Sequence, residues 1–344
     1  MKKINSERRA WLENRRRKIE RLRSRRLHKS FGRSILHIEQ KNQYGEYSLT
    51  APKNFSLMNN LDETLQYFHR VNKAIQMCRS NTILYFDLSA IEDASPDAFM
   101  YVVALLKNNR RIQMLQIPCV GNEPIADKPR SLLNKAGFFN YVNSRRFHPI
   151  ENEESQLRIY RGSKSDPSLA QKMCEFVHIR TGEAINRLGT KRLFPMFIEL
   201  MNNVKQHAFD CDNTEDANFR NWYTYAEDIG SELRFVFLDT GKGIPETIQK
   251  NFLEKLPLVK TDARFISSAL KGDFRTDTGE RHRGKGLPEI YDNVRKHAIK
   301  SLSILSGKGL CIVDGNGNIT EKNLVYAFDG TMYMWTIEKK EEVA

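Results

Sequence analysis

The fold of this 344-residue chain is decided by the stretch Phe197-Ile198-Glu199-Leu200-Met201-Asn202-Asn203-Val204-Lys205-Gln206-His207-Ala208. Apolar side chains recur in it at helical spacing, and neither Gly nor Pro interrupts it, so the stretch predicts one amphipathic helix. Its polar residues Glu199, Asn203, Gln206 and His207 share a second face. A carboxylate can accept a proton or orient water, and an amide oxygen one turn later can bind Mg²⁺. Taken alone, the segment is explained more simply by a solvated polar face.

A glycine-containing motif follows the next pair of predicted strands. The runs 222–226 and 233–238 predict a hairpin, and the second run leads into Asp239-Thr240-Gly241-Lys242-Gly243-Ile244-Pro245. Two glycines one residue apart at a strand end let the backbone turn tightly against a planar or charged ligand, and Asp239 is a hydrogen-bond acceptor beside that turn. Many hairpins end in such a motif, so it indicates a binding site only in combination with other motifs.

A second glycine-rich turn precedes another predicted helix. Gly284-Lys285-Gly286-Leu287 leads into that helix, and such a turn can hold phosphate groups because unpaired N–H groups and the helix dipole attract anions. Residues 246–283, between the two motifs, are rich in Lys and Arg and show little apolar periodicity. Strands are predicted after it at 301–305, 310–313 and 328–337, and the last contains Gly330-Thr331.

The order of these motifs resembles the GHKL superfamily of nucleotide-binding domains, which is found in DNA gyrase, heat-shock chaperones, histidine kinases and mismatch-repair proteins. The resemblance covers roughly residues 169–339, about half of the chain. The ending Asn-x-x-x-His-Ala of the first helix is especially similar to the anti-sigma-factor serine kinases of that superfamily. The resemblance implies an α/β sandwich of the histidine kinase-like ATPase type that binds ATP and Mg²⁺.

The resemblance also implies roles for individual residues. Asn203 would coordinate the Mg²⁺ that bridges the ATP phosphates, and Glu199 would be the general base or water-orienting group. Asp239 would accept a hydrogen bond from the adenine amino group, supported by the Thr331 hydroxyl. The other residues that it places at the cofactor are Gly241, Gly243 and Ile244 beside the base and Gly284, Lys285, Gly286 and Leu287 around the phosphates. Residues 246–283 would form the lid over ATP.

The region before this domain predicts a smaller α/β domain. Its expected elements are a helix at 61–77, a strand at 82–88, a helix at 98–106 and a strand at 112–120. The start signal Asp93-Ala94-Ser95-Pro96 precedes the second helix, and the stretch 132–138 predicts a short helix that ends at Gly137. Strands separated by helices indicate a sheet with helices packed against it.

Residues 87–95, with the elements around them, resemble the STAS fold of anti-sigma-factor antagonists and sulfate-transporter tails. Ser95 stands at the position of that family's phosphoacceptor serine, while Ala94 and Pro96 replace a Ser and a Gly of the family pattern. A Ser95 that only caps the helix satisfies the pattern equally well. The resemblance implies a module that docks with a protein partner.

The first 33 residues carry most of the net charge. They hold 14 Lys or Arg against three acids, while the whole chain has a formal charge of +13. This predicts a basic helix with a thin apolar stripe. Three roles for this helix are left open: a solvated extension, an arm that binds nucleic acid, and a contact to an anionic membrane surface or acidic partner. Binding to nucleic acid would weaken steeply with salt.

The composition bounds the remaining possibilities. Five scattered cysteines with no Cys-x-x-Cys pair argue against a disulfide framework or a zinc cluster, and the longest apolar run, 99–106, is too short to span a bilayer. We therefore expect a cytoplasmic protein with no transmembrane segment. The expected organisation is a basic helical extension at 1–34, a STAS-like α/β domain at 35–150, a linker at 151–168 and the ATPase-like domain at 169–344, with a homodimer left open.

Three functional hypotheses remain at this stage. The first is a signalling ATPase or serine/threonine protein kinase that acts on a protein partner. The second is a switch in which ATP binding alone changes partner affinity. The third is a nucleic-acid-associated ATPase that uses residues 1–33 to hold the polynucleotide.

Overall fold

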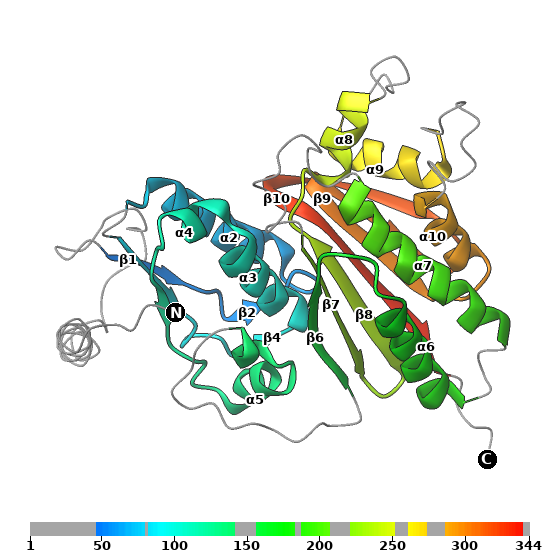
Figure 1. Cartoon of the computed structure of the whole chain (residues 1–344), viewed down its shortest axis with the longest axis horizontal. Coiled ribbons are helices and arrows are strands. Elements are labelled where there is room, and N and C mark those ends of the chain that lie inside the picture. The colour runs from blue at the N-terminus through cyan, green and yellow to red at the C-terminus, as the bar shows by residue number, and fades with distance from the viewer. Residues whose placement is uncertain are drawn as a thin grey trace. The chain divides into compact units, whose positions relative to one another are not determined.

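The computed structural model describes residues 46–79, 82–141, 156–182, 187–206, 221–251, 261–273 and 286–339 (Figure 1). All of them belong to one compact unit, 41–344. Parallel and antiparallel sheets with packed helices confirm the mixed α/β (α+β) class. The predicted basic helix at 1–34 lies outside the described residues. No helix within these ranges is both long and apolar enough to cross a membrane.

The N-terminal part, residues 46–141, is built on a parallel sheet in the order β1-β3-β5. Its strands are β1 (Glu46–Thr50), β3 (Ile83–Asp87) and β5 (Cys119–Gly121), and β2 (Asn54–Phe55) pairs separately with β4 (Asp93–Ala94). Its helices are α2 (Leu61–Met77), α3 (Pro96–Asn108), α4 (Arg110–Met114), α5 (Asp127–Lys135) and the 3₁₀ turn η1 (Phe138–Asn140).

Sequence periodicity located the longer of these elements correctly. The helix predicted at 61–77 has the same bounds in the structure. The strand predicted at 112–120 is confirmed only at 119–120, in β5, and is wrong before that. Asn109 accepts a hydrogen bond from the N–H of Ile112 and starts the short helix α4 instead. The last helix begins earlier than predicted, at Asp127, and ends just before Gly137, which adopts a φ of 71°.

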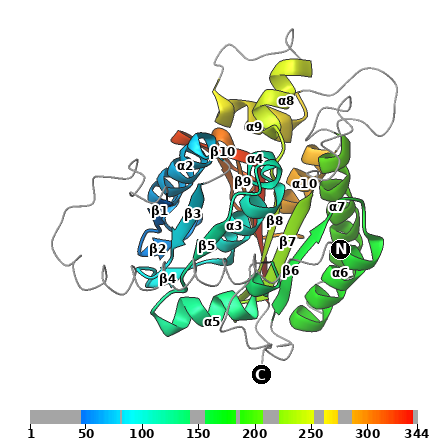
Figure 2. The same cartoon turned by 60° about the vertical axis from the view of Figure 1, so that its left-hand side comes forward.

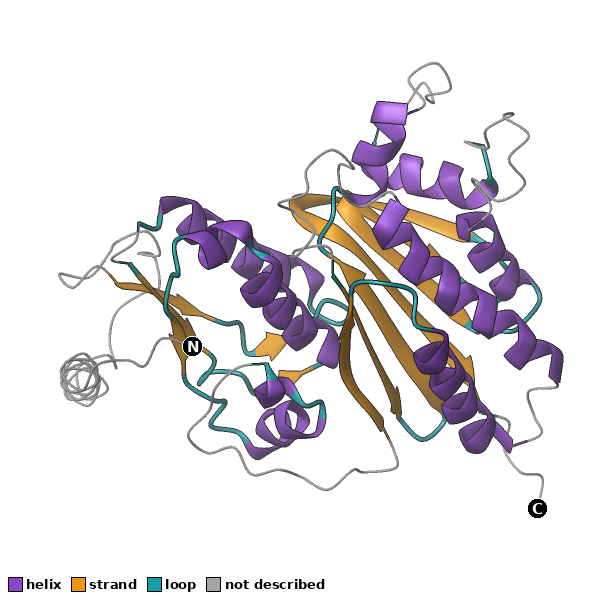
Figure 3. Ribbon diagram, in the orientation of Figure 1, coloured by secondary structure: helices purple, strands orange, loops and turns teal. Residues whose placement is uncertain are grey.

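The C-terminal part forms a five-stranded antiparallel sheet in the order β6-β7-β8-β10-β9 (Figure 3). Its strands are β6 (Gln156–Gly162), β7 (Trp222–Asp228), β8 (Glu232–Asp239), β9 (Ser301–Val313) and β10 (Ile319–Glu338). Its helices are α6 (Pro167–Thr181), α7 (Arg187–Gln206), α8 (Gly243–Asn251), α9 (Asp262–Lys271) and α10 (Gly286–Arg295).

Three expectations for this part need correction. Strand β6 lies inside the stretch 151–168 that was interpreted as a linker, and Ile159 is buried in the edge of the sheet. The two strands expected at 301–305 and 310–313 are one continuous strand, β9. The segment 246–283, in which little apolar periodicity was recognised, contains the end of α8 and all of α9, whose apolar side chains at Ala263, Ile266 and Leu270 are fully buried. The role of this segment as a lid over ATP stays a prediction.

Helices cover both faces of the five-stranded sheet. Helices α6, α7 and α10 pack on one face of the sheet (Figure 1). That face carries Phe235 and Trp335, whose rings stack 5.3 Å apart. Helices α2 and α3 pack on the opposite face, which carries Tyr223 and Met332 (Figure 2). Where helices cover both faces, the strands are continuously buried instead of alternating, at 222–226 of β7, 235–238 of β8 and 332–335 of β10.

Candidate functional site

Three polar side chains form a row across one end of the otherwise apolar sheet. Thr331 on β10 lies opposite Asp239 on β8 and opposite Ser306 on β9, so the three share the face that packs against α7. Their exposed fractions are 6% for Asp239, 3% for Thr331 and 0% for Ser306. Burying polar groups costs free energy unless partners satisfy them, so such a row requires a structural or functional reason.

Asp239 is the most unusual member of this row. Its Oδ1 accepts the N–H of Gly241 at 2.8 Å, which closes the turn after β8. Burial raises the pKa of the Asp239 carboxyl to about 7, and the Gly241 hydrogen bond only partly opposes that rise. Within the described ranges no Lys, Arg or His forms an ion pair with it. A buried carboxylate with so little compensation has the capacity to accept a further hydrogen bond from an N–H donor.

Ser306 holds the glycine turn against β10. Its Oγ accepts the N–H of Ile244 at 3.0 Å, and its hydroxyl lies 2.8 Å from the carbonyl oxygen of Gly330, to which it donates. Gly243 has a φ of 80°, and a Cβ there would lie 2.6 Å from Ser306 Oγ. The turn therefore needs both the left-handed backbone and the missing side chain of Gly243.

Replacing Ser306 by Ala is expected to lower the free energy of unfolding by about 1–3 kcal/mol, because the buried N–H of Ile244 loses its acceptor. Urea unfolding of both proteins measures the difference. Ser303→Ala, on the same strand but only half-buried, is the matched control and should change stability by less than about 0.5 kcal/mol. Equal losses in the two variants would contradict this role of Ser306.

Glu199 on α7 meets the first residue of α10. The carboxylate is half-buried, and a Cβ built on Gly286 would overlap it, so a side chain at position 286 would displace the Glu199 carboxylate. Burial raises the pKa of Glu199, and the negative charge of Glu289 adds to the rise. A carboxylate with a raised pKa is a stronger base, which suits it to take a proton from water or a hydroxyl.

Tyr333 lies near both Asp239 and Glu199. It is buried on β10, two residues beyond Thr331 and on the same face of the sheet. Burial raises the pKa of its hydroxyl, and the negative charges of Asp239 and then Glu199 add to the effect. Both carboxylates therefore lie within electrostatic reach of one side chain, although 40 residues separate them along the chain.

The structure gathers most of the residues named from the sequence into two groups. One surrounds the end of β8 and consists of Asp239, Gly241, Gly243, Ile244 and Thr331. The other lies where α7 meets α10 and consists of Glu199, Gly286 and Leu287. Asn203 lies one turn after Glu199 and is half-buried, with no hydrogen bond to another described side chain. Gly284, Lys285 and His207 lie outside the described residues.

A metal ion would depend on few protein ligands here. Within the described ranges no group of three or more His, Cys, Asp or Glu side chains could hold a metal. Mg²⁺ commonly keeps several waters and binds through one or two protein oxygens together with substrate phosphates. The single amide oxygen of Asn203, which is half-buried one turn after Glu199 on α7, fits that mode.

Sequence reasoning missed Ser306 and Asn108. Ser306 is one of three serines in β9 and the one that is fully buried, which the sequence does not distinguish from Ser301 and Ser303. Asn108 is buried at the end of α3 and hydrogen-bonds to Thr240 beside Asp239, a contact across 132 residues for which the sequence carries no signal.

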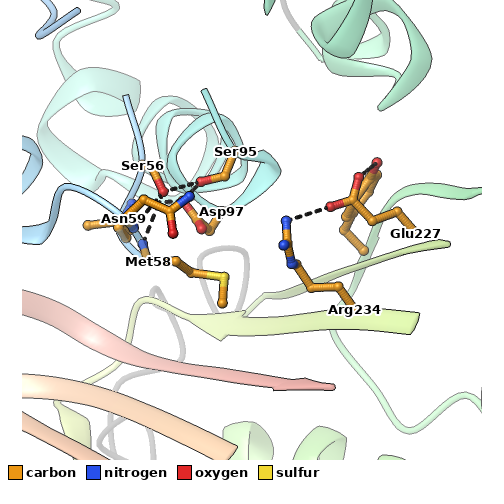
Figure 4. Close-up of polar contacts among 9 residues, drawn as sticks. Ser56, Met58, Asn59, Ser95, Asp97, Glu227 and Arg234 are labelled. Atoms are coloured by element: carbon orange, nitrogen blue, oxygen red, sulfur yellow. Dashed lines mark hydrogen bonds and ion pairs between the residues drawn. The ribbon is translucent and has the colours of Figure 1, made fainter. Parts of the chain in front are cut away.

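Ser95, the position that resembles a phosphoacceptor, lies in a closed polar cluster (Figure 4). It is only 3% exposed, and its hydroxyl lies 2.6 Å from Ser56 Oγ and 2.7 Å from Asp97 Oδ1. The hydroxyl forms no capping hydrogen bond to α3, although Ser95 immediately precedes that helix. In this conformation Ser95 cannot reach a phosphoryl donor.

No protein-family model matches the chain, and no curated protein matches its sequence.

Proposed function

We propose that this chain is a Mg²⁺-dependent ATP-binding protein of the GHKL type that acts as a cytoplasmic regulatory ATPase or serine/threonine protein kinase. The observation that carries the proposal is the buried carboxylate of Asp239, which lies opposite Thr331 and closes a glycine turn. An exocyclic amino group donates hydrogen bonds, so the amino group of adenine matches an acceptor at this position.

The second group of residues supports the phosphate end of the same ligand. Helix α10 begins at Gly286, and the N–H groups of its first turn favour an anion. Glu199, held against Gly286, would orient or deprotonate the attacking water or hydroxyl. Asn203 would hold Mg²⁺, which supplies charge neutralisation at the phosphates when it is bound.

Replacing Asn203 by Ala is expected to weaken ATP binding in the presence of Mg²⁺ by about tenfold or more and to leave binding in the presence of EDTA unchanged, because only the metal contact is lost. Isothermal titration calorimetry under the two conditions measures the difference. Asn202→Ala is the matched control, since Asn202 hydrogen-bonds to Ser165 on the neighbouring segment. Equal ATP affinity in wild type and Asn203→Ala would remove Asn203 from the metal site.

The fate of the γ-phosphate separates the activities that remain. The purified protein would be incubated with γ-labelled ATP, with and without candidate partner proteins. Label on a protein indicates a kinase, label released as phosphate indicates an ATPase, and bound but intact ATP indicates a switch. Failure of the wild type to bind ATP at all would overturn the proposal.

A further inference from the structure

The last residue of α3 is a buried amide whose hydrogen-bonding capacity is fully used. Asn108 is 7% exposed. Its Nδ2 donates to Thr240 Oγ1 at 2.9 Å and to the carbonyl oxygen of Asn221 at 3.3 Å. Its Oδ1 accepts from Asn221 Nδ2 at 3.0 Å and from the Tyr223 hydroxyl at 2.9 Å. An Asn side chain has two donor hydrogens and two acceptor sites, so these four contacts satisfy it completely.

This amide fixes the turn that presents Asp239. Thr240 lies between Asp239 and Gly241, the two residues joined by the hydrogen bond that closes the turn. Asn221 directly precedes β7, whose first residue lies opposite Asp239. One side chain of the N-terminal part therefore connects the start of β7 with the end of β8.

A second set of contacts reaches the strand that carries Thr331. Asn72 on α2 donates from Nδ2 to Asp329 Oδ2 at 2.6 Å. The ring of Tyr101 on α3 packs against Phe328 with a centroid separation of 4.4 Å. Both contacts lie in the irregular part of β10 where its register with β9 shifts, just before Thr331.

Gly330, between Asp329 and Thr331, packs directly against the backbone of Asp239. Its φ is 106°, and a Cβ there would overlap the backbone carbonyl of Asp239. The segment 328–331 and the turn 239–241 are therefore packed directly against each other. Displacing either segment would change the distance between the Asp239 carboxylate and the Thr331 hydroxyl.

We propose that residues 46–141 position the nucleobase end of the site, with Asn108 as the positioning residue, so that docking of α2 and α3 on the sheet and nucleotide binding favour each other. The proposal rests on the proposed function and assigns it a means of regulation. Coupling between two sites is reciprocal, so a partner that pulls α3 from the sheet weakens nucleotide binding, and bound nucleotide holds α3 in place.

The opposite end of α3 supplies the contrast that tests this idea. Ser95 and Asp97 are also buried in a polar network, but that network faces Ser56 and lies one helix length from Thr240. Ser95→Ala therefore perturbs the same helix without touching the turn. Any effect that comes only from weakened packing should appear there too.

The experiment uses the full chain and compares wild type with Thr240→Val, Thr240→Ser and Ser95→Ala. Val removes the hydroxyl that Asn108 contacts and keeps the shape of the side chain, whereas Ser keeps the hydroxyl. Calorimetry would measure affinity for ATP and for inorganic tripolyphosphate, which lacks the base. We expect Thr240→Val to bind ATP about fivefold more weakly, with tripolyphosphate affinity unchanged and Thr240→Ser and Ser95→Ala close to wild type.

Amide hydrogen exchange tests the reciprocal effect. ATP should slow exchange at the C-terminal turn of α3 in the wild type, and Thr240→Val should reduce that protection. Unchanged ATP affinity in Thr240→Val, or an equal loss in Ser95→Ala, would overturn this inference and leave the proposed function standing. A wild type that binds no ATP would overturn both.

Discussion

Asp239→Asn is expected to weaken ATP binding by at least about 100-fold and, in the same protein, to increase stability above pH 7. The carboxylate Oδ1 accepts the N–H of Gly241, so Asn would keep its carbonyl there and direct its NH₂ group towards the ligand. A donor would then face the donor amino group of adenine. Sites built around a specific hydrogen bond discriminate by about 10⁴-fold or more against a ligand that cannot form it, so a 100-fold loss is a conservative expectation.

The stability effect follows from the raised pKa of Asp239. Its folded-state pKa of about 7 lies above the ordinary value of 3.8 for an aspartate, so folding favours the protonated form. The stability that this gives the wild type is fully present below about pH 4 and is lost as the pH rises through 7. Asn is neutral at every pH, so the variant should be more stable than wild type by about 2–4 kcal/mol at pH 8 and similar to it at pH 4.

Thermal or urea unfolding at pH 4, 6 and 8, together with calorimetric titration of ATP, measures both effects. Asp228→Asn, at the far end of the neighbouring strand β7, is the matched control because Asp228 is paired with Lys339. It should lose a little stability and keep its ATP affinity. An Asp239→Asn protein that is less stable at pH 8 would contradict the proposed ionisation, and one that binds ATP normally would contradict the nucleobase contact.

The local motifs of this site could be predicted from the sequence, whereas the pairing between its strands could not. The strand end at Asp239 and the helix with Glu199 could be recognised because periodicity and glycine spacing are local signals. That Thr331 lies opposite Asp239 depends on the register of β10, which contains irregular pairing at 323–331. No local pattern gives such a register.

Helix α9 shows why other parts could not be predicted. Its apolar residues follow helical spacing, but two buried serines, Ser267 and Ser268, interrupt them, and the exposed charge of Arg264 lies among them within a basic segment. The packing of α2 and α3 on the five-stranded sheet could not be predicted for a different reason. Apolar residues on the second face of β7 and β8 look like ordinary core until the elements that cover them are known.

Glu199→Gln is expected to retain ATP and to lower turnover or transfer by about 100–1000-fold, because the amide keeps the shape of the carboxylate and cannot accept a proton. Single-turnover measurements of γ-phosphate release or transfer at saturating ATP separate this loss from weaker binding. Glu289→Gln is the control, since Glu289 only raises the pKa of Glu199 from an exposed position, and should change the rate less than about threefold. Unchanged activity in Glu199→Gln would instead favour the ATP-dependent switch.

Gly286→Ala provides an independent route to the same loss. The added methyl group would overlap the Glu199 carboxylate, and the least costly relief is rotation of that flexible side chain away from α10. The variant should therefore bind ATP and lose most of its turnover, as Glu199→Gln does. If both changes act through one carboxylate, the double variant will be no slower than the slower single variant. Multiplied losses in the double variant would mean that Gly286 serves phosphate binding separately from the position of Glu199.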